Sequence, residues 1–399
     1  MIWAHGINKD FRRFFIAQAI SFIGTWMHNM AQGWLVYSLT KSSLILGLTA
    51  MAQSLPILLF SLLGGVLADR YDKRKIIMLT QAIAIVPPIL LYILKELDIV
   101  NIWHIMALSF LMGTVQALDI PVRQSFVTTV VGKDNILTAI AINSMAFHGA
   151  RIVGPAIASA IIKTYDIAIC FFINAITYLP IIYVLYKMKT HTPPAIPQTK
   201  GMCQDFKDGL RYIKDDKQMT FIMLTVSLFS LLALPFGHFL PVFADKIFKT
   251  DVGGLGYLMA SMGVGALMAG LILILRGNVK NKVSYMTTTG LCFPIALILV
   301  SVTNNIFIAC IFIAIIGWSS VSFLATTNSY LQLKSSDLLR GRIVSVFSLT
   351  FLGVMPFGYT ILGTISEFLG IQKTTFLTAT LSLIGFVVFN RKWKQNQLV

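Results

Sequence analysis

The chain has 399 residues, of which 56% are hydrophobic and only 12% are charged, and its net charge is +16. A water-soluble protein of this length cannot hide so much apolar surface in its core, so the composition excludes a soluble globular protein. A lipid bilayer accommodates such a chain because it acts as an apolar solvent, and we therefore predict a membrane protein.

The apolar residues form long continuous runs, each close to the roughly 20 residues that a helix needs to cross a bilayer. Backbone groups in lipid must be bonded within the segment, and the runs do not alternate as the strands of a barrel do, so we predict an all-α membrane protein. Twelve transmembrane helices are expected, in two six-helix bundles: Phe14–Leu39, Leu44–Ala68, Ile76–Leu94, Trp103–Val122, Ile136–Ile162, Ile167–Tyr186, Thr220–Phe243, Gly254–Leu275, Val283–Val302, Ile306–Tyr330, Ile343–Ser366 and Ile371–Phe389.

A polar segment separates the two sets of spans. Residues 189–218 are basic and contain Pro193, Pro194 and Pro197, which predicts a cytosolic linker between an N-terminal bundle (1–188) and a C-terminal bundle (219–399). Apolar residues at helical spacing in Phe206–Ile213 predict an amphipathic helix at the membrane surface within this linker.

Lysine and arginine cluster in alternate turns between the spans, as the positive-inside rule predicts for cytosolic loops. The two termini, the turn after the second span and the linker all lie on the richer side, so both termini are expected in the cytosol. This distribution also explains the high positive charge without a nucleic acid as partner. The four cysteines form no CxxC pair, and we expect no metal site, disulfide framework or cofactor. The first apolar run is too long for a cleavable signal peptide and is expected to be the first span.

Polar residues occur at mid-depth in several predicted spans. His28 and Gln32 are four residues apart and share a helix face. Each such residue is interpreted either as a substrate contact or as an interhelical hydrogen bond. The candidates are His28, Asn29, Gln32, Gln53, Gln116 and, in the second set of spans, Trp318.

The turn after the second span combines a glycine, an Asp-Arg pair and a basic cluster, in the run Gly65-Val-Leu-Ala-Asp69-Arg70-Tyr-Asp-Lys73-Arg74-Lys75. Gly65 allows close approach of another helix. The Asp69 carboxylate lies at the membrane edge and needs a partner, such as the free N–H groups of a helix N-terminus. The alternative is an ordinary basic turn on the cytosolic side.

The fourth span ends in Asp119 and Arg123, which are four residues apart and can form an ion pair. Two interpretations stay open. The pair is either local, or part of a network with Arg74 that breaks when a cytosolic gate opens.

The fifth span places His148 and Arg151 inside the apolar region. Arg151 lies roughly 15 residues from the cytosolic end, near mid-bilayer at 1.5 Å per residue. A charge there is costly, so it should face a cavity or a partner, and a packing role is the alternative. Gly154 permits close packing and Pro155 a bend.

These motifs resemble those of the major facilitator superfamily, and the resemblance covers essentially the whole chain. The Gly65–Lys75 run is similar to its loop after the second helix, except that Asp72 stands where a glycine is usual; the resemblance implies that Asp69 contacts the start of the eleventh helix, near Ile343. Gly149 and the Gly154-Pro155 pair resemble a fifth-helix motif associated with exporters. The segments starting at Asp119, Ala150 and Leu339 look like the branch that contains the bacterial enterobactin exporter and macrolide efflux pumps.

The resemblance implies a non-enzymatic secondary transporter in the bacterial cytoplasmic membrane, a monomer that exports a siderophore or an amphiphilic drug by alternating access. No Asp or Glu lies at mid-bilayer, so proton coupling would have to use Asp119, His28 or His148. Two alternatives stay open: uptake of a nutrient or metabolite by the same fold, and a membrane-embedded binding or signalling protein without turnover.

Overall fold

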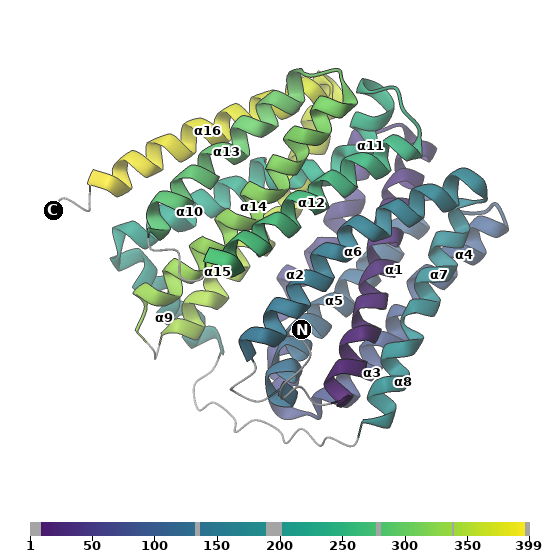
Figure 1. Ribbon diagram of the computed structural model, residues 1–399, viewed down its shortest axis with the longest axis horizontal. Coiled ribbons are helices and arrows are strands. Elements are labelled where there is room, and N and C mark those ends of the chain that lie inside the picture. Colours follow the sequence, from purple (N-terminus) through teal and green to yellow (C-terminus); the bar gives the residue numbers. More distant parts are fainter. Residues whose placement is uncertain (1–8, 132–135, 189–201, 277–280, 337–338, 396–399) are drawn as a thin grey trace. The chain divides into compact units, whose positions relative to one another are not determined.

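The computed structural model describes residues 9–131, 136–188, 202–276, 281–336 and 339–395 (Figure 1). These residues form helices and short turns and contain no strand. An all-α membrane fold is thus confirmed for the described part of the chain.

Two compact units make up the chain. The first comprises residues 1–39 and 52–197, and the second comprises residues 40–51 and 198–399. The helices of the first unit are α1 (Lys9–Thr40), α2 (Ser43–Arg70), α3 (Lys73–Ala84), α4 (Val86–Glu96), α5 (Ile102–Val131), α6 (Ile136–Thr164), α7 (Ile167–Thr177) and α8 (Leu179–Lys187).

The second unit contains the remaining helices and the beginning of α2, whose residues up to Met51 group with it. Its helices are α9 (Met202–Asp215), α10 (Lys217–Leu232), η2 (Leu234–Phe239), α11 (Leu240–Val242), η3 (Phe243–Ile247), α12 (Val252–Arg276), α13 (Lys282–Val302), α14 (Ile306–Lys334), α15 (Arg340–Leu369) and α16 (Ile371–Gln395).

Three of the predicted spans are interrupted by proline. The break between α3 and α4 precedes Pro87, the break between α7 and α8 precedes Pro180, and α10 gives way to short helices at Pro235 and Pro241. Proline lacks the N–H that the preceding turn requires, so each helix is broken or kinked at that point. The pieces of each interrupted helix still lie within a single candidate membrane span.

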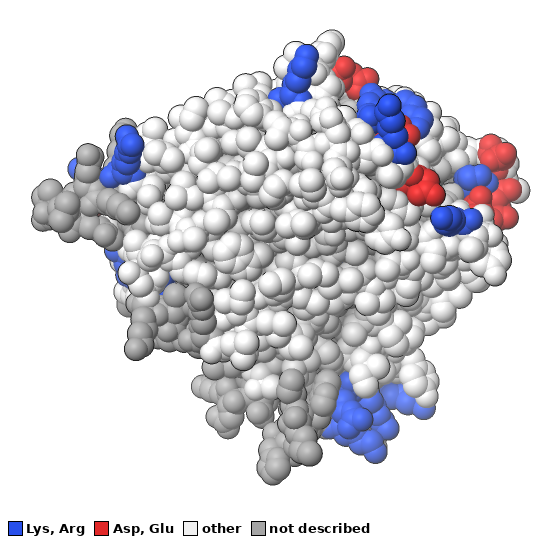
Figure 2. Space-filling model, turned by 45° about the horizontal axis from the view of Figure 1, so that its top comes forward, with Lys and Arg blue, Asp and Glu red and all other residues white. Residues whose placement is uncertain are grey.

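Eleven helices or helix pairs among the described residues are long and apolar enough to cross a membrane. The one predicted span missing from this set is α1, whose polar side chains lower its hydropathy, so a count of twelve fits the fold but is not confirmed. Large apolar side chains face outward along the helices, for example Phe307 at 77% exposed and Leu275 at 84%. On the face seen in Figure 2 most of the surface is white, and the charged side chains are gathered in a few groups. This is the surface of a multi-pass membrane protein.

The predicted linker helix is present as α9, but the preceding linker residues 189–201 lie outside the described part of the chain. Gly209 packs against the start of α15, where a Cβ on this glycine would lie 3.1 Å from the carbonyl oxygen of Arg342. Ile213 is buried. The helix therefore belongs to the second unit, while the bundle limits 1–188 and 219–399 remain predictions.

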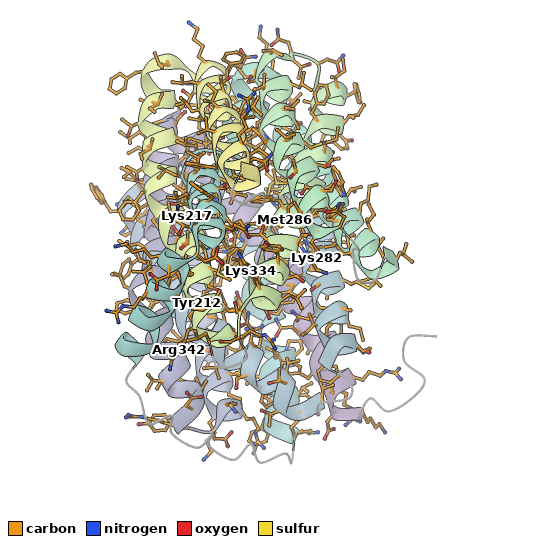
Figure 3. All side chains as sticks on the ribbon, turned by 90° about the vertical axis from the view of Figure 1, so that its left-hand side faces the viewer. Tyr212, Lys217, Lys282, Met286, Lys334 and Arg342 are labelled. Atoms are coloured by element: carbon orange, nitrogen blue, oxygen red, sulfur yellow. The ribbon has the colours of Figure 1, made fainter. Side chains whose placement is uncertain are left out.

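Basic side chains from several helices gather at one end of the second unit. Figure 3 labels Lys217 of α10, Lys282 of α13, Lys334 of α14 and Arg342 of α15. Successive helices begin or end there, as expected for the side that the charge pattern predicts to be cytosolic.

Candidate functional site

Arg151 lies on α6 in the first unit, and its guanidinium carbon lies over the indole ring of Trp26 on α1, 5.0 Å from the ring centroid. Both side chains are half-buried. A cation over an aromatic face at this distance is attracted by the electron-rich ring, and more strongly where water is scarce. The structure thus gives the predicted mid-span charge a defined aromatic neighbour.

Gly154 allows α1 and α6 to approach closely at this point. A Cβ on Gly154 would lie 2.7 Å from Cβ of Trp26 and 2.8 Å from the carbonyl oxygen of Ile23, closer than real Cβ atoms approach. The predicted close packing at Gly154 is therefore present, and Pro155 lies buried beside it within α6. Gly149 has open space where its Cβ would be.

Trp26 belongs to a cluster of aromatic rings centred on Phe147. The ring of Phe147 lies 5.6 Å from that of Trp26 and 5.4 Å from that of Phe22, in edge-to-face arrangements. The imidazole of His148 lies 5.4 Å from Phe147. This cluster combines one fixed cation with apolar ring surfaces, and α6 itself contains no Asp or Glu. Such a surface suits a ligand with anionic oxygens and an apolar or aromatic part.

The polar side chains of α1 are tied into the first unit by hydrogen bonds. His28 and Gln32 are linked by a bond of 3.0 Å, and the Gln32 amide donates to Ser109 Oγ of α5 at 3.0 Å. His28 is 2% exposed and Gln32 is 7% exposed. For Gln32 the geometry favours the interhelical hydrogen bond over direct substrate contact, whereas the hydrogen bond of His28 stays within α1.

The other polar candidates are dispersed. Asn29, Gln53 and Gln116 are half-buried in the first unit, and the backbone of Gln53 lies against Gly113 of α5. Trp318 belongs to α14 of the second unit, where its indole N–H is buried without a hydrogen-bond partner among the described residues. A role in substrate binding stays a prediction for all of them.

Asp119 is buried at 4% exposure and holds a local hydrogen-bond network. Its carboxylate pairs with Arg123 and accepts hydrogen bonds from Thr80 Oγ1 at 2.6 Å and Gln81 Nε2 at 3.0 Å. The predicted pair of Asp119 with Arg123 is confirmed. In the described part of the chain, the guanidinium of Arg74 instead donates to the backbone carbonyls of Tyr186 and Met188, so a network of Asp119 with Arg74 stays a prediction.

The turn after α2 explains why this chain has an aspartate where a glycine is usual. Asp72 is the N-cap of α3, and its carboxylate accepts the backbone N–H of Arg74 at 3.0 Å. Asp69 and Arg70 are exposed. The adjacent Gly64 packs closely against α5, where a Cβ would lie 2.6 Å from Cγ of Pro121 and 2.7 Å from the carbonyl oxygen of Ala117, while close packing at Gly65 stays a prediction. The expected partner of Asp69, the start of α15, belongs to the second unit, and the lock stays a prediction.

Trp26 and Phe147 are not among the site residues predicted from the sequence. Their signal is weak because an aromatic residue in an apolar helix is usually part of the core, and only the spacing of Phe22 and Trp26 at i and i+4 indicates a shared face. Their significance depends on Arg151, which reaches Trp26 from another helix.

Comparisons with known proteins find matches to transport proteins. The chain matches a family model described as transmembrane secretion effector over residues 2–396. It is 26% identical to the staphyloferrin A transporter of Staphylococcus aureus over 96% of each chain. It is 21% identical to macrolide efflux protein A of Streptococcus pyogenes over 93% of each chain. Its fold is similar to that of a nucleoside transporter crystal structure, with a TM-score of 0.77, 13% identity and coverage of 96% of this chain and 99% of the other.

Proposed function

Because the chain belongs to the transmembrane secretion effector family of the major facilitator superfamily, and is therefore a membrane transporter of small molecules, we propose that it exports a siderophore from the bacterial cytosol. Export proceeds by alternating access and is driven by protons, with both termini in the cytosol. The comparisons name transport proteins, which argues against an enzyme and against a binding or signalling protein without turnover.

The observation that carries this proposal is the arginine held over Trp26 in the first unit. A siderophore binds Fe³⁺ through hard oxygen donors, many of them anionic before the metal binds. A guanidinium matches paired oxygens with two parallel hydrogen bonds, which a lysine cannot copy. The helix that carries Arg151 contains no Asp or Glu, so its own side chains do not repel an anionic ligand. The similarity to a staphyloferrin A transporter over almost the whole chain supports the same class of substrate.

Inside-out membrane vesicles provide the test, because an exporter accumulates its substrate in them. The protein is expressed in a host that lacks its own siderophore exporters, and inside-out vesicles are prepared from its membranes. A proton gradient is imposed across these vesicles, and uptake of labelled staphyloferrin A and enterobactin is measured. We expect uptake of at least one siderophore, abolished by a protonophore. Accumulation only in right-side-out vesicles would instead support an importer, and no uptake of any siderophore would reject the proposal.

A second candidate is export of an amphiphilic drug. The aromatic cluster favours it, since Phe147 is 39% exposed and offers its ring to an apolar ligand. The relative named as a macrolide efflux protein supports this alternative. Drug susceptibility of the same host, measured with and without this protein, separates the two candidates.

A further inference from the structure

Trp26 occupies a position that the transport proposal does not by itself explain. It lies on α1, which carries the buried hydrogen-bonded pair of His28 and Gln32 on a neighbouring part of the helix. The Trp26 ring instead meets Arg151 of α6 on its face and Phe147 of α6 at 5.6 Å. One aromatic residue of α1 therefore contacts both the charged and the apolar part of the candidate site.

The backbone around Trp26 is set by a close helix crossing. Gly154 leaves room for Trp26 Cβ, since a side chain on this glycine would overlap both that atom and the backbone N of Met27, at 2.7 and 2.9 Å. Gly154 itself is buried. With its Cβ held against α6, the indole has few positions available, and the neighbouring ring of Phe147 restricts them further.

Unlike the restricted indole of Trp26, the side chain of Arg151 is long and flexible, and it loses much rotamer freedom when it is fixed. A ring beneath the guanidinium lowers this cost before any ligand arrives, since the cation already has a favourable position. The N–H donors of a guanidinium lie in its own plane, so a contact with a ring face does not use them. A contact with the ring face can therefore hold the group in place without using its donors.

We propose that Trp26 is a positioning residue that acts through Arg151, holding its guanidinium so that paired donors meet a carboxylate-type group of the transported anion. This inference rests on the proposed function and identifies the recognised group as one with two adjacent oxygens. In this arrangement Gly154 allows Trp26 to lie close to α6, Trp26 orients Arg151, and Arg151 contacts the substrate.

The experiment measures KM and Vmax for siderophore uptake into inside-out vesicles for Trp26→Leu, Trp26→Phe, Arg151→Lys and the double variant Trp26→Leu/Arg151→Lys. The Trp26→Leu change should raise KM about tenfold, as expected for losing a desolvated cation–π contact. Because Phe keeps an aromatic face, Trp26→Phe should retain most of the affinity. The double variant should bind no worse than Arg151→Lys alone, since Trp26 acts only through that side chain.

Trp34→Leu serves as the matched control, because it removes a tryptophan from the same helix at a distance of two turns. It should leave KM unchanged. Two outcomes overturn the proposal: additive effects of Trp26→Leu and Arg151→Lys on KM, or a Trp26→Leu protein that is less abundant yet transports with the wild-type KM.

A second measurement does not need a substrate and so separates this inference from the proposed function. In a protein whose other five of the six tryptophans are replaced by Phe, acrylamide quenching reports on access to the Trp26 ring. Arg151→Ala should raise quenching by about twofold, because it uncovers one of the two ring faces. Arg123→Ala, in the same unit, should not. Unchanged quenching in Arg151→Ala overturns the positioning role, whereas absence of siderophore transport by the wild type overturns only the proposed function.

Discussion

At the scale of single residues, substitutions of Arg151 distinguish a residue that contacts substrate from one that only supports helix packing. Arg151→Lys keeps the charge but loses the planar pair of donors, so transport of an acidic substrate should weaken while the protein stays folded. Arg151→Ala should raise KM at least about tenfold, the effect of losing a hydrogen bond to a charged group. Uptake kinetics and thermal melting in detergent are measured together. Early melting of both variants with unchanged KM would identify a packing role instead.

Local spacing explains which contacts of single residues could be predicted from sequence. The pair of Asp119 with Arg123 and that of His28 with Gln32 both join residues four apart on one helix, and both are present. The contact of Trp26 with Arg151 joins helices that are distant along the chain, so it depends on how α1 and α6 pack and no periodicity reveals it. The family resemblance does not predict the cap at Asp72, because the family has a glycine at this position and a glycine has no side chain to cap a helix.

At the scale of helices, Glu367 near the end of α15 caps the start of α2. One of its carboxylate oxygens accepts the backbone N–H groups of Ser43 at 2.8 Å and Leu44 at 3.2 Å, and the hydroxyl of Ser42 at 3.1 Å. Below it the two helices touch through Gly363, where a Cβ would lie 2.9 Å from the carbonyl oxygen of Ser43. Residues 40–51 therefore group with the second unit, although the same helix continues into the first.

Removing this cap should destabilise the second unit. Glu367→Gln keeps the shape but loses the negative charge at the helix N-terminus, and Glu367→Ala also loses the acceptor, so the latter should cost about 1 kcal/mol. The melting temperature in detergent should fall by a few degrees for Ala and by less for Gln. Glu96→Ala, at an exposed position ending α4, is the control. Equal melting of Glu367→Ala and the control would show that the cap contributes nothing.

The start of α10 predicts a dependence of stability on pH. Asp216 accepts the backbone N–H groups of Gln218 at 2.8 Å and Met219 at 3.0 Å and pairs with Lys334 at 2.6 Å. Burial alone would raise the pKa of Asp216, but the hydrogen bonds and the charge of Lys334 outweigh it and lower the pKa below its usual 3.8. Because the folded pKa is the lower one, this stabilisation is present above pH 3.8 and is lost as the pH falls through the folded value. The difference in melting temperature between wild type and Asp216→Ala should be full at neutral pH and shrink in acid. A difference independent of pH would contradict the ion pair.

At the scale of the whole molecule, the apolar helices followed from composition, whereas hydropathy gives eleven of the twelve expected spans in the described part of the chain. Hydropathy alone does not include α1, because His28, Asn29 and Gln32 interrupt its apolar run. Of the two buried ones, Gln32 donates a hydrogen bond to Ser109 of α5, a contact that a linear sequence does not display, and His28 is bonded to Gln32 within α1. The same polar residues therefore lower the hydropathy of α1, which hides it as a membrane span, and also mark α1 as a helix that carries the candidate site.

Transport driven by protons requires a group that gains and loses a proton during the cycle, and Asp119 is the candidate on which the prediction rests. Within the described membrane-spanning helices every other Asp and Glu lies near a helix end, and the Asp119 carboxylate is held by donors only: Thr80, Gln81 and Arg123. A role of Asp119 in the transport cycle would require its ion pair with Arg123 to break and re-form. Asp119→Asn removes the site and keeps the shape. It should permit exchange of substrate down its gradient but abolish the response to an imposed pH gradient, whereas Glu367→Gln should retain that response.

Reconstituted vesicles with a trapped pH dye measure proton counterflow directly. Equal counterflow in Asp119→Asn and wild type would contradict this role, and His148, beside the aromatic cluster, would become the next residue to replace, ahead of the fully buried His28.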